Sequence, residues 1–151
     1  TSIGQGNTLV SPMHMALITS AIANDGKLMQ PYYIDRVETI NGTKVKSTKP
    51  TVYKELMTAS EAATLTNLMA EEVNRGTGTQ LSGESYSAAG KTGSAEYYGA
   101  DGSIKTHSWF IGFSNVEDPD LVVAVIAEGA GTGSSVAVPV AHEIFNAFYY
   151  G

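Results

Sequence analysis

Three runs of strand-forming residues follow one another in the second half of the chain, with only short turns between them. The runs cover residues 87–98, 106–114 and 121–127. Asp101-Gly102 separates the first two runs, and Asp118-Pro119-Asp120 separates the last two; both are sequences that favour tight turns. Parallel strands need a long crossover connection, usually a helix, so connections this short predict an antiparallel meander.

A helix and a hairpin are predicted before this meander. Ser11-Pro12 supplies an N-cap hydroxyl and a proline at the first helical position, and Asn24-Asp25-Gly26 supplies a stop signal. Residues 32–40 and 43–47 then flank Asn41-Gly42, which predicts a hairpin with a two-residue turn.

Two further helices complete the prediction. Thr58 and Glu61 have capping-box spacing and open a helix that is expected to present one apolar side, made of Ala62, Leu65, Leu68, Met69 and Val73. The last helix is predicted over residues 136–148, with Pro139 in its first turn. Residues 121–127 are apolar throughout, so this strand is expected to be covered on both faces. The order of elements predicts an α+β fold, an antiparallel sheet with flanking helices.

Composition excludes several classes of function. The net charge of −6 and the absence of a basic stripe argue against nucleic acid as a partner. Without cysteine the chain has no disulfide or thiolate metal site, and His14, His107 and His142 have no metal-ligand spacing. No metal or cofactor is therefore predicted. The chain begins with Thr1, which we interpret as the start of a trimmed or processed chain.

Several other motifs are interpreted as structural. Gly90-Lys91-Thr92 is not the end of a P-loop, because Ser85 stands where that motif needs glycine and a strand follows instead of a helix. The glycine-rich loop at residues 129–135 is expected to be a connector that ends in a helix cap. Glu71-Glu72 is expected to form a solvated helix face, and Trp109 to be a core residue.

Lys91-Thr92-Gly93-Ser94 is the strongest candidate for a binding site. Side chains alternate along a strand, so Thr92 and Ser94 are expected on one face. Two hydroxyls beside an ammonium make a good receptor for a carboxylate. Gly93 between them leaves room for a ligand to approach the backbone. The tripeptide Lys-Thr-Gly also occurs, with S-x-x-K and S-D-N, in penicillin-binding proteins and serine β-lactamases.

The surrounding sequence resembles the class B penicillin-binding proteins along nearly its whole length. Six segments occur in the order of that family: Ile3-Gly4-Gln5-Gly6 with Ser11-Pro12-Met13-His14-Met15-Ala16, Ala23-Asn24-Asp25-Gly26, Arg75-Gly76-Thr77-Gly78-Thr79, Gly90-Lys91-Thr92-Gly93-Ser94-Ala95-Glu96, His107-Ser108-Trp109-Phe110-Ile111-Gly112-Phe113, and Ala137-Val138-Pro139.

The resemblance implies a partial penicillin-binding/serine β-lactamase-like transpeptidase fold, with residues 1–151 as the C-terminal half of the transpeptidase domain. The S-x-x-K and S-x-N motifs do not occur in this sequence and are expected upstream of Thr1; the nearest match, Thr51-Val52-Tyr53-Lys54, lies in the wrong context. The parent is then a serine-type D-Ala-D-Ala transpeptidase that binds penicillin and cross-links the cell wall, whereas this chain alone is expected to be inactive.

The same resemblance implies the roles of the site residues. Lys91 is expected to be catalytic and to bind substrate, together with Thr92, Gly93 and Ser94, and the backbone N–H of Ser94 is expected to be an oxyanion-hole donor. The expected partners are the peptidoglycan stem peptide ending in D-Ala-D-Ala, β-lactams and the upstream half of the domain. The isolated chain is expected to self-associate. The implied location is the extracytoplasmic face of the bacterial cell membrane, with an anchor outside this chain.

Two alternatives stay open at this point. A class D β-lactamase or a β-lactam sensor domain shares the Lys-Thr-Gly strand, although the Gly-Gln-Gly turn and the Gly-Thr-Gly loop favour a transpeptidase. A non-catalytic binding or assembly module could keep this part of the fold without the nucleophile.

Overall fold

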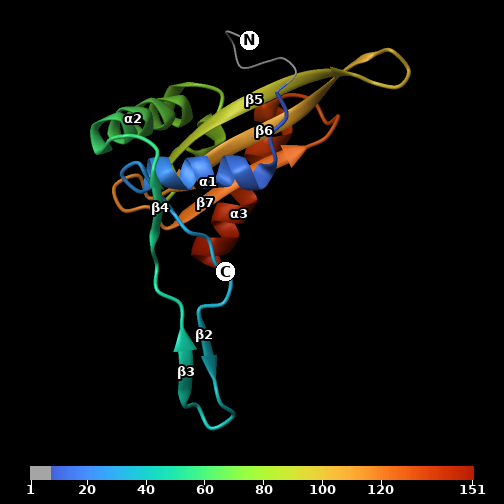
Figure 1. The fold of residues 1–151 in the computed structure, drawn as a ribbon. Coiled ribbons are helices and arrows are strands. Elements are labelled where there is room, and N and C mark those ends of the chain that lie inside the picture. The colour runs from blue at the N-terminus through green and yellow to red at the C-terminus, as the bar shows by residue number, and fades with distance from the viewer. Residues whose placement is uncertain (1–7) are drawn as a thin grey trace.

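The computed structural model describes residues 8–151, and these residues have the predicted α+β architecture (Figure 1). The helices are α1 (Pro12–Ala23), α2 (Ala59–Arg75) and α3 (Val138–Tyr150), with a 3₁₀ turn η1 (Thr79–Leu81) and a π turn η2 (Gly133–Ala137). The strands are β1 (Lys27–Met29), β2 (Arg36–Glu38), β3 (Lys44–Ser47), β4 (Val52–Glu55), β5 (Ala88–Tyr98), β6 (Ile104–Ser114) and β7 (Leu121–Ala127). The segment Ile3-Gly4-Gln5-Gly6 lies outside the described residues.

The predicted meander is confirmed. β5, β6 and β7 form one antiparallel sheet in that order, so β6 lies in the middle and β5 has a free edge within residues 8–151. β5 and β6 pair in continuous register, with Gly93 opposite Trp109 and Ser94 opposite Ser108. This long antiparallel ladder fixes the face on which each side chain of β5 lies.

Helices cover both faces of the sheet, as Figure 1 shows with α1 on one side and α3 on the other. The face toward α3 buries Phe110 and Val123 against Phe145. The opposite face buries Phe113 against Ile22 of α1 and Met69 of α2. Because Val122 and Val123 of β7 belong to opposite cores, the expectation that this strand is covered on both faces is confirmed.

The capping box of α2 is also confirmed, but the predicted apolar side of this helix is partly wrong. The backbone N–H of Thr58 donates to Glu61 Oε2 at 2.8 Å, and the N–H of Glu61 donates to Thr58 Oγ1 at 3.3 Å. The hydrogen bonds that the Thr58 N–H and the Thr58 hydroxyl donate to the Glu61 carboxylate lower the pKa of this carboxyl. Leu68, however, is 62% exposed, and Leu65 is also exposed, because the sheet lies against the side that carries Met69 and Val73.

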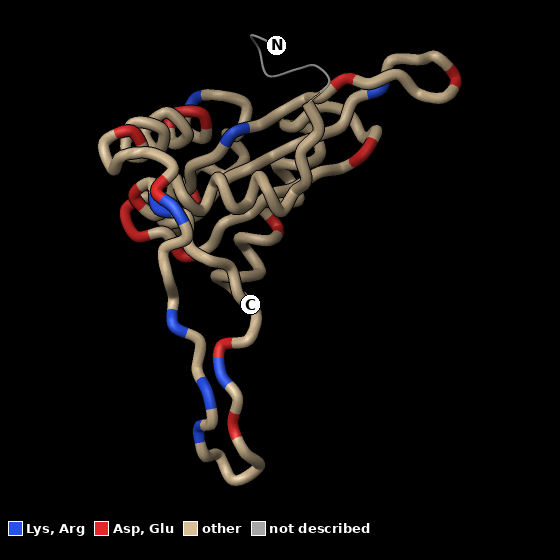
Figure 2. Tube along the Cα trace, in the orientation of Figure 1, with Lys and Arg blue, Asp and Glu red and all other residues tan. Residues whose placement is uncertain are grey.

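The predicted hairpin forms a narrow arm that projects away from the sheet (Figure 1). Its turn is one residue longer than predicted: Thr39 N–H donates to the Thr43 carbonyl, and Gly42 N–H donates to the Thr39 carbonyl. Gly42 has φ 78°, a conformation in which glycine meets no steric penalty. The arm carries many of the charged residues of the molecule, while the three-stranded sheet carries few (Figure 2).

β1 and β4 form an additional two-stranded sheet that the sequence did not predict. β1 has three residues and β4 has four, and a stretch of more than twenty residues separates them in the sequence. Strands this short have almost no visible alternation of apolar and polar residues, so only their pairing identifies them.

The glycine-rich loop before α3 is bound to the sheet, contrary to the expectation of a simple connector with a helix cap. Ser108 is fully buried; its hydroxyl donates to the Thr132 carbonyl at 2.6 Å and accepts the Ala137 N–H at 3.0 Å. η2 and α3 have no side-chain cap, so this buried serine satisfies the end of the helix in its place.

Ser108→Ala is expected to lower the free energy of unfolding by about 1–3 kcal/mol, because it leaves the buried Ala137 N–H without its acceptor. Chemical denaturation of a folded chain that contains these residues measures the change. The matched control is Ser60→Ala at an exposed serine of α2, which should stay within about 0.5 kcal/mol. Equal stabilities for the two variants would contradict this account of Ser108.

Candidate functional site

Lys91 and Thr92 lie on the free edge of β5, where an ammonium and a hydroxyl meet. Lys91 Nζ donates to the Thr92 carbonyl at 2.8 Å and to Thr92 Oγ1 at 3.4 Å. The Lys91 side chain is 60% exposed, so its charge faces solvent as well as the strand. The edge therefore presents a cation, a hydroxyl and backbone polar groups within a few ångströms of one another.

Glu72 of α2 lies beside this pair, and the prediction of a solvated Glu71-Glu72 face is wrong for it. Glu72 Oε1 accepts the Thr77 hydroxyl at 2.5 Å and the Thr92 hydroxyl at 3.1 Å, and lies 3.9 Å from Lys91 Nζ. Only 12% of its side chain is exposed. Glu71, by contrast, is exposed as predicted, and it forms an ion pair with Arg75.

A signal for Glu72 was present in the sequence. It follows Met69 by three residues and precedes Val73 by one, and both of these apolar residues are buried. Residues three apart lie on the same side of a helix, so a carboxylate at this position faces the sheet at the end of α2. Helical spacing could not show which residues the Glu72 carboxylate contacts.

The Gly-Thr-Gly loop encloses the Glu72 carboxylate. A Cβ placed on Gly78 would lie 2.6 Å from Glu72 Oε2, and one placed on Gly76 would lie 2.6 Å from the Glu72 carbonyl. Thr77 between them donates to Glu72 and is also within 2.5 Å of Thr92 Oγ1. Gly76 is thus packed against the main chain of α2 and Gly78 against the buried carboxylate, and Thr77 connects that carboxylate to β5.

Thr92 and Ser94 share a face of β5, as the alternation of side chains requires. Their partners in β6 are Phe110 and Ser108, which are both fully buried on the side of α3. The Ser94 hydroxyl accepts the backbone N–H of Gly133 at 3.2 Å. A Cβ on Gly133 would lie 2.8 Å from the Gly93 carbonyl, so the glycine-rich loop packs directly against the candidate strand.

Trp109 lines a cavity beside Lys91 and is only half-buried, so its assignment to the core is corrected. The cavity has a volume of about 240 Å³, and its apolar walls include Trp109, Ile111 and Met15. Lys91, Thr92 and Gly93 form its polar side. Trp109 faces Gly93 across the ladder, and the absence of a side chain at Gly93 leaves the indole accessible.

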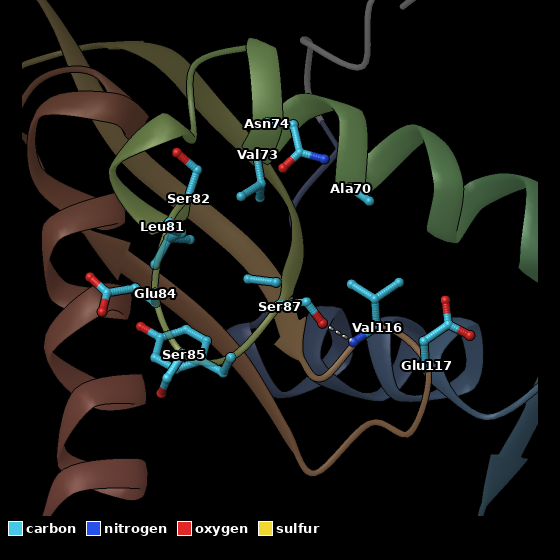
Figure 3. Close-up of a pocket in the computed structure, with 13 residues that line it drawn as sticks. Ala70, Val73, Asn74, Leu81, Ser82, Glu84, Ser85, Ser87, Val116 and Glu117 are labelled. Atoms are coloured by element: carbon cyan, nitrogen blue, oxygen red, sulfur yellow. Dashed lines mark hydrogen bonds between the residues drawn. The ribbon is translucent and has the colours of Figure 1, made fainter.

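A second cavity, of about 460 Å³, lies between the end of α2 and the segment before β5 (Figure 3). Glu84 and Glu117 contribute its charged groups, and a Ser87–Val116 hydrogen bond closes one side. Burial, and then the charge of Glu84, raise the pKa of Tyr86 in its wall to about 12. This cavity holds none of the residues predicted to bind a ligand.

The histidines do not converge. His107 stacks on Tyr97 at 4.1 Å between ring centroids, and His142 Nε2 lies 2.8 Å from Glu84 Oε1. Residues 8–151 contain no group of three or more histidine, cysteine or acidic side chains that could hold a metal ion.

The candidate site is thus an edge strand with Lys-Thr-Gly, beside a Gly-Thr-Gly loop, in an antiparallel sheet that helices cover on both faces. Comparison with known families identifies the family of the chain. The family model for the penicillin-binding protein transpeptidase domain matches residues 1–146. The chain therefore belongs to the penicillin-binding protein transpeptidase family.

Individual relatives agree. The chain is 34% identical over 146 residues to the peptidoglycan D,D-transpeptidase PbpA of Mycolicibacterium smegmatis, with 92% of this chain and 29% of the relative covered. It is 30% identical over 165 residues to the peptidoglycan D,D-transpeptidase MrdA of Haemophilus influenzae, with 98% of this chain and 25% of the relative covered. Among solved structures, penicillin-binding protein A of M. tuberculosis as a ceftriaxone acyl-enzyme complex superposes with a TM-score of 0.83 at 30% identity, with 97% of this chain and 34% of that chain covered. The chain thus spans a quarter to a third of the length of these proteins.

Gly78→Ala is expected to lower the free energy of unfolding by about 1 kcal/mol, the low end for overpacking, because the added methyl group meets Glu72 Oε2, the end of a side chain that can shift at the expense of its hydrogen bonds to Thr77 and Thr92. Gly78 has φ −95°, which alanine adopts freely, so backbone strain does not contribute. Chemical denaturation measures the cost in the wild-type background and in a Glu72→Ala background. The cost should largely disappear when Glu72 is alanine; an equal cost in both backgrounds would show that the added methyl group meets something else.

Proposed function

We propose that residues 1–151 are the C-terminal half of the transpeptidase domain of a peptidoglycan D,D-transpeptidase. In this proposal the Lys91–Ser94 strand binds the stem peptide. The observation that carries the proposal is the meeting of Lys91 and Thr92 on the free edge of β5, in a chain whose match to the transpeptidase family covers residues 1–146. PbpA and MrdA are both named peptidoglycan D,D-transpeptidases, which supports the same substrate class for this protein.

In the proposed reaction, Lys91 and the hydroxyls of Thr92 and Ser94 hold the terminal carboxylate of D-Ala-D-Ala through charge-assisted hydrogen bonds. A serine from the rest of the domain attacks the carbonyl of the penultimate D-alanine, and the terminal D-alanine leaves with a proton as the acyl-enzyme forms. An amine of a second stem peptide then attacks the ester and releases the serine. A β-lactam enters the first step in the same way, and its ring opens without losing a leaving group.

The backbone of β5 supports the role of Ser94 as an oxyanion-hole donor. Along the edge strand of an antiparallel pair, the peptide groups of alternate residues face away from the partner. The Thr92 carbonyl accepts a hydrogen bond from Lys91 Nζ, which indicates that the backbone N–H and C=O of Thr92 point away from β6. Ser94 follows two residues later, so its backbone N–H and C=O point away from β6 as well. Its N–H is then directed toward a ligand at the edge, where it can stabilise a developing oxyanion.

The remainder of the domain is the proposed structural partner. Apolar side chains at and just before α1 line two cavities: Val10 lines one, and Met13 and Leu17 line the other. Val10 and Met13 are exposed. Large apolar side chains gathered around a cleft are typical of surfaces that another part of a protein covers. In the isolated chain the same surface favours self-association.

The proposed location is the extracytoplasmic face of the bacterial cell membrane, where peptidoglycan is cross-linked. The two relatives compared above are both bacterial proteins. Within residues 8–151, none of the helices has the length and apolar character that a bilayer crossing requires. The proposal therefore assigns the anchor to another segment of the parent protein.

Covalent labelling tests the proposed function. We expect a chain that carries the complete domain to form a stoichiometric adduct with a fluorescent penicillin, and residues 1–151 alone to form none, because they contain no S-x-x-K serine. Intact mass spectrometry reads both results. An adduct on residues 1–151 alone would contradict the assignment of the nucleophile, and rapid release of hydrolysed penicillin by the complete domain would favour a β-lactamase.

Ser94→Pro in the complete domain is expected to slow acylation by roughly 10²–10³-fold, the usual effect of losing one oxyanion-hole donor. Proline removes the N–H, and its ring is tolerated on an edge strand. Stopped-flow labelling gives the rate, and the thermal midpoint reports folding. Ser94→Ala is the matched control, because it removes the hydroxyl and keeps the N–H. A folded Ser94→Pro domain that is acylated within a few-fold of the Ser94→Ala rate would show that this N–H has another role.

A further inference from the structure

The hydroxyl group of Thr92 cannot serve Glu72 and an incoming carboxylate at the same time. A threonine hydroxyl has one proton to donate. Thr77 and Thr92 lie 2.5 Å apart at their hydroxyl oxygens, and each also lies within hydrogen-bond distance of Glu72 Oε1, at 2.5 and 3.1 Å. When both threonine hydroxyl protons form hydrogen bonds among Glu72, Thr77 and Thr92, the Thr92 proton points to Glu72 or to Thr77. Thr92 then turns only lone pairs toward the edge.

The Lys91 ammonium is likewise shared between Glu72 and an incoming carboxylate. The ammonium lies 3.9 Å from Glu72 Oε1, so a carboxylate bound at Lys91 comes close to a second negative charge. Glu72 is largely buried, and charges removed from water are poorly screened by solvent and salt. Its Oε2 atom is buried and has no hydrogen-bond partner among the described residues, so only Oε1 of this carboxylate is hydrogen-bonded.

From these contacts we propose that Glu72 is a positioning residue that sets how tightly the substrate strand binds carboxylates. As an anion it holds the Thr92 proton inward and competes for Lys91, and so weakens the binding of the terminal carboxylate. The inference rests on the proposed function for the identity of the ligand. It adds to that function a built-in acid that limits the affinity of the site for its own substrate class.

Glu72→Gln distinguishes this role from simple support of the strand. Glutamine has nearly the same volume as glutamate, and its amide can donate to the Thr77 or Thr92 oxygen, which frees the Thr92 proton for the ligand. It also removes the charge that opposes the ligand. We expect the variant to bind a carboxylate about tenfold more tightly than wild type. If Glu72 only held the substrate strand in place, the same substitution would weaken carboxylate binding.

The test uses the complete domain and two probes, N-acetyl-D-alanyl-D-alanine and the same dipeptide with its C-terminus amidated. NMR titration, followed at the Thr92 methyl group, gives the dissociation constants for wild type and Glu72→Gln. Glu71→Gln is the matched control, because Glu71 lies next in sequence, is exposed and pairs with Arg75 instead of β5. Glu72→Asp is a second variant, whose shorter side chain withdraws the carboxylate from Thr92 and should tighten binding to a smaller extent.

The inference is supported if Glu72→Gln tightens binding of the acid but not of the amide, and Glu71→Gln changes neither. It is overturned if both Glu72 variants bind the acid as wild type does or more weakly, or if the acid and the amide gain equally. Penicillin labelling of the wild-type domain is recorded in parallel. If the wild type is acylated but the Glu72 variants show no gain, the inference alone fails; if the wild type neither binds the acid nor is acylated, the proposed function fails with it.

Discussion

β5 pairs with β6 from Ala88 opposite Ser114 to Tyr98 opposite Ile104 without a shift, and the location of each candidate residue depends on that register. Because side chains alternate along a strand, the register places Thr92 and Ser94 on the face that α3 covers, and Lys91 on the face that meets Trp109. A slip of one residue would exchange the two sets. The buried phenylalanines of β6 oppose such a slip, because Phe110 and Phe113 belong to different cores and neither could leave its core without a large loss of buried apolar area.

The edge of β5 gains its chemistry from two segments that pack against it. On one side, the end of α2 and the Gly-Thr-Gly loop bring Glu72 and Thr77 to Thr92. On the other side, Gly133 approaches the backbone of β5 closely and donates to Ser94, while Ser108 holds the same loop from β6. Glycine serves a steric purpose in both loops, since a Cβ would collide with Glu72 in the first and with Gly93 in the second. The hydroxyls that we propose to bind substrate are therefore held by contacts on either side.

Much of the fold and part of the site could be predicted from the sequence. The three strands of the meander, the turns between them, the capping box of Thr58 and Glu61 and the helix start at Ser11-Pro12 all depend on residues close together in the chain, and the structure confirms them. Lys91-Thr92-Gly93-Ser94 was also recognisable, because its residues are contiguous. The β1–β4 pair, the exposure of Leu68 and the burial of Glu72 were missed, since each depends on which distant segment packs there.

The sequence by itself determined the local conformations and the family, because caps, turns, alternation and ordered motifs are encoded in neighbouring residues. Only the tertiary structure decided what the Lys-Thr-Gly strand contacts. Glu72 precedes Thr92 by twenty positions, Gly133 follows Ser94 by thirty-nine, and neither separation has a periodicity that could reveal the contact. The physical reason is that such contacts arise from the packing of α2 and the loop before α3 against a sheet, and packing is set by the shapes of many side chains together.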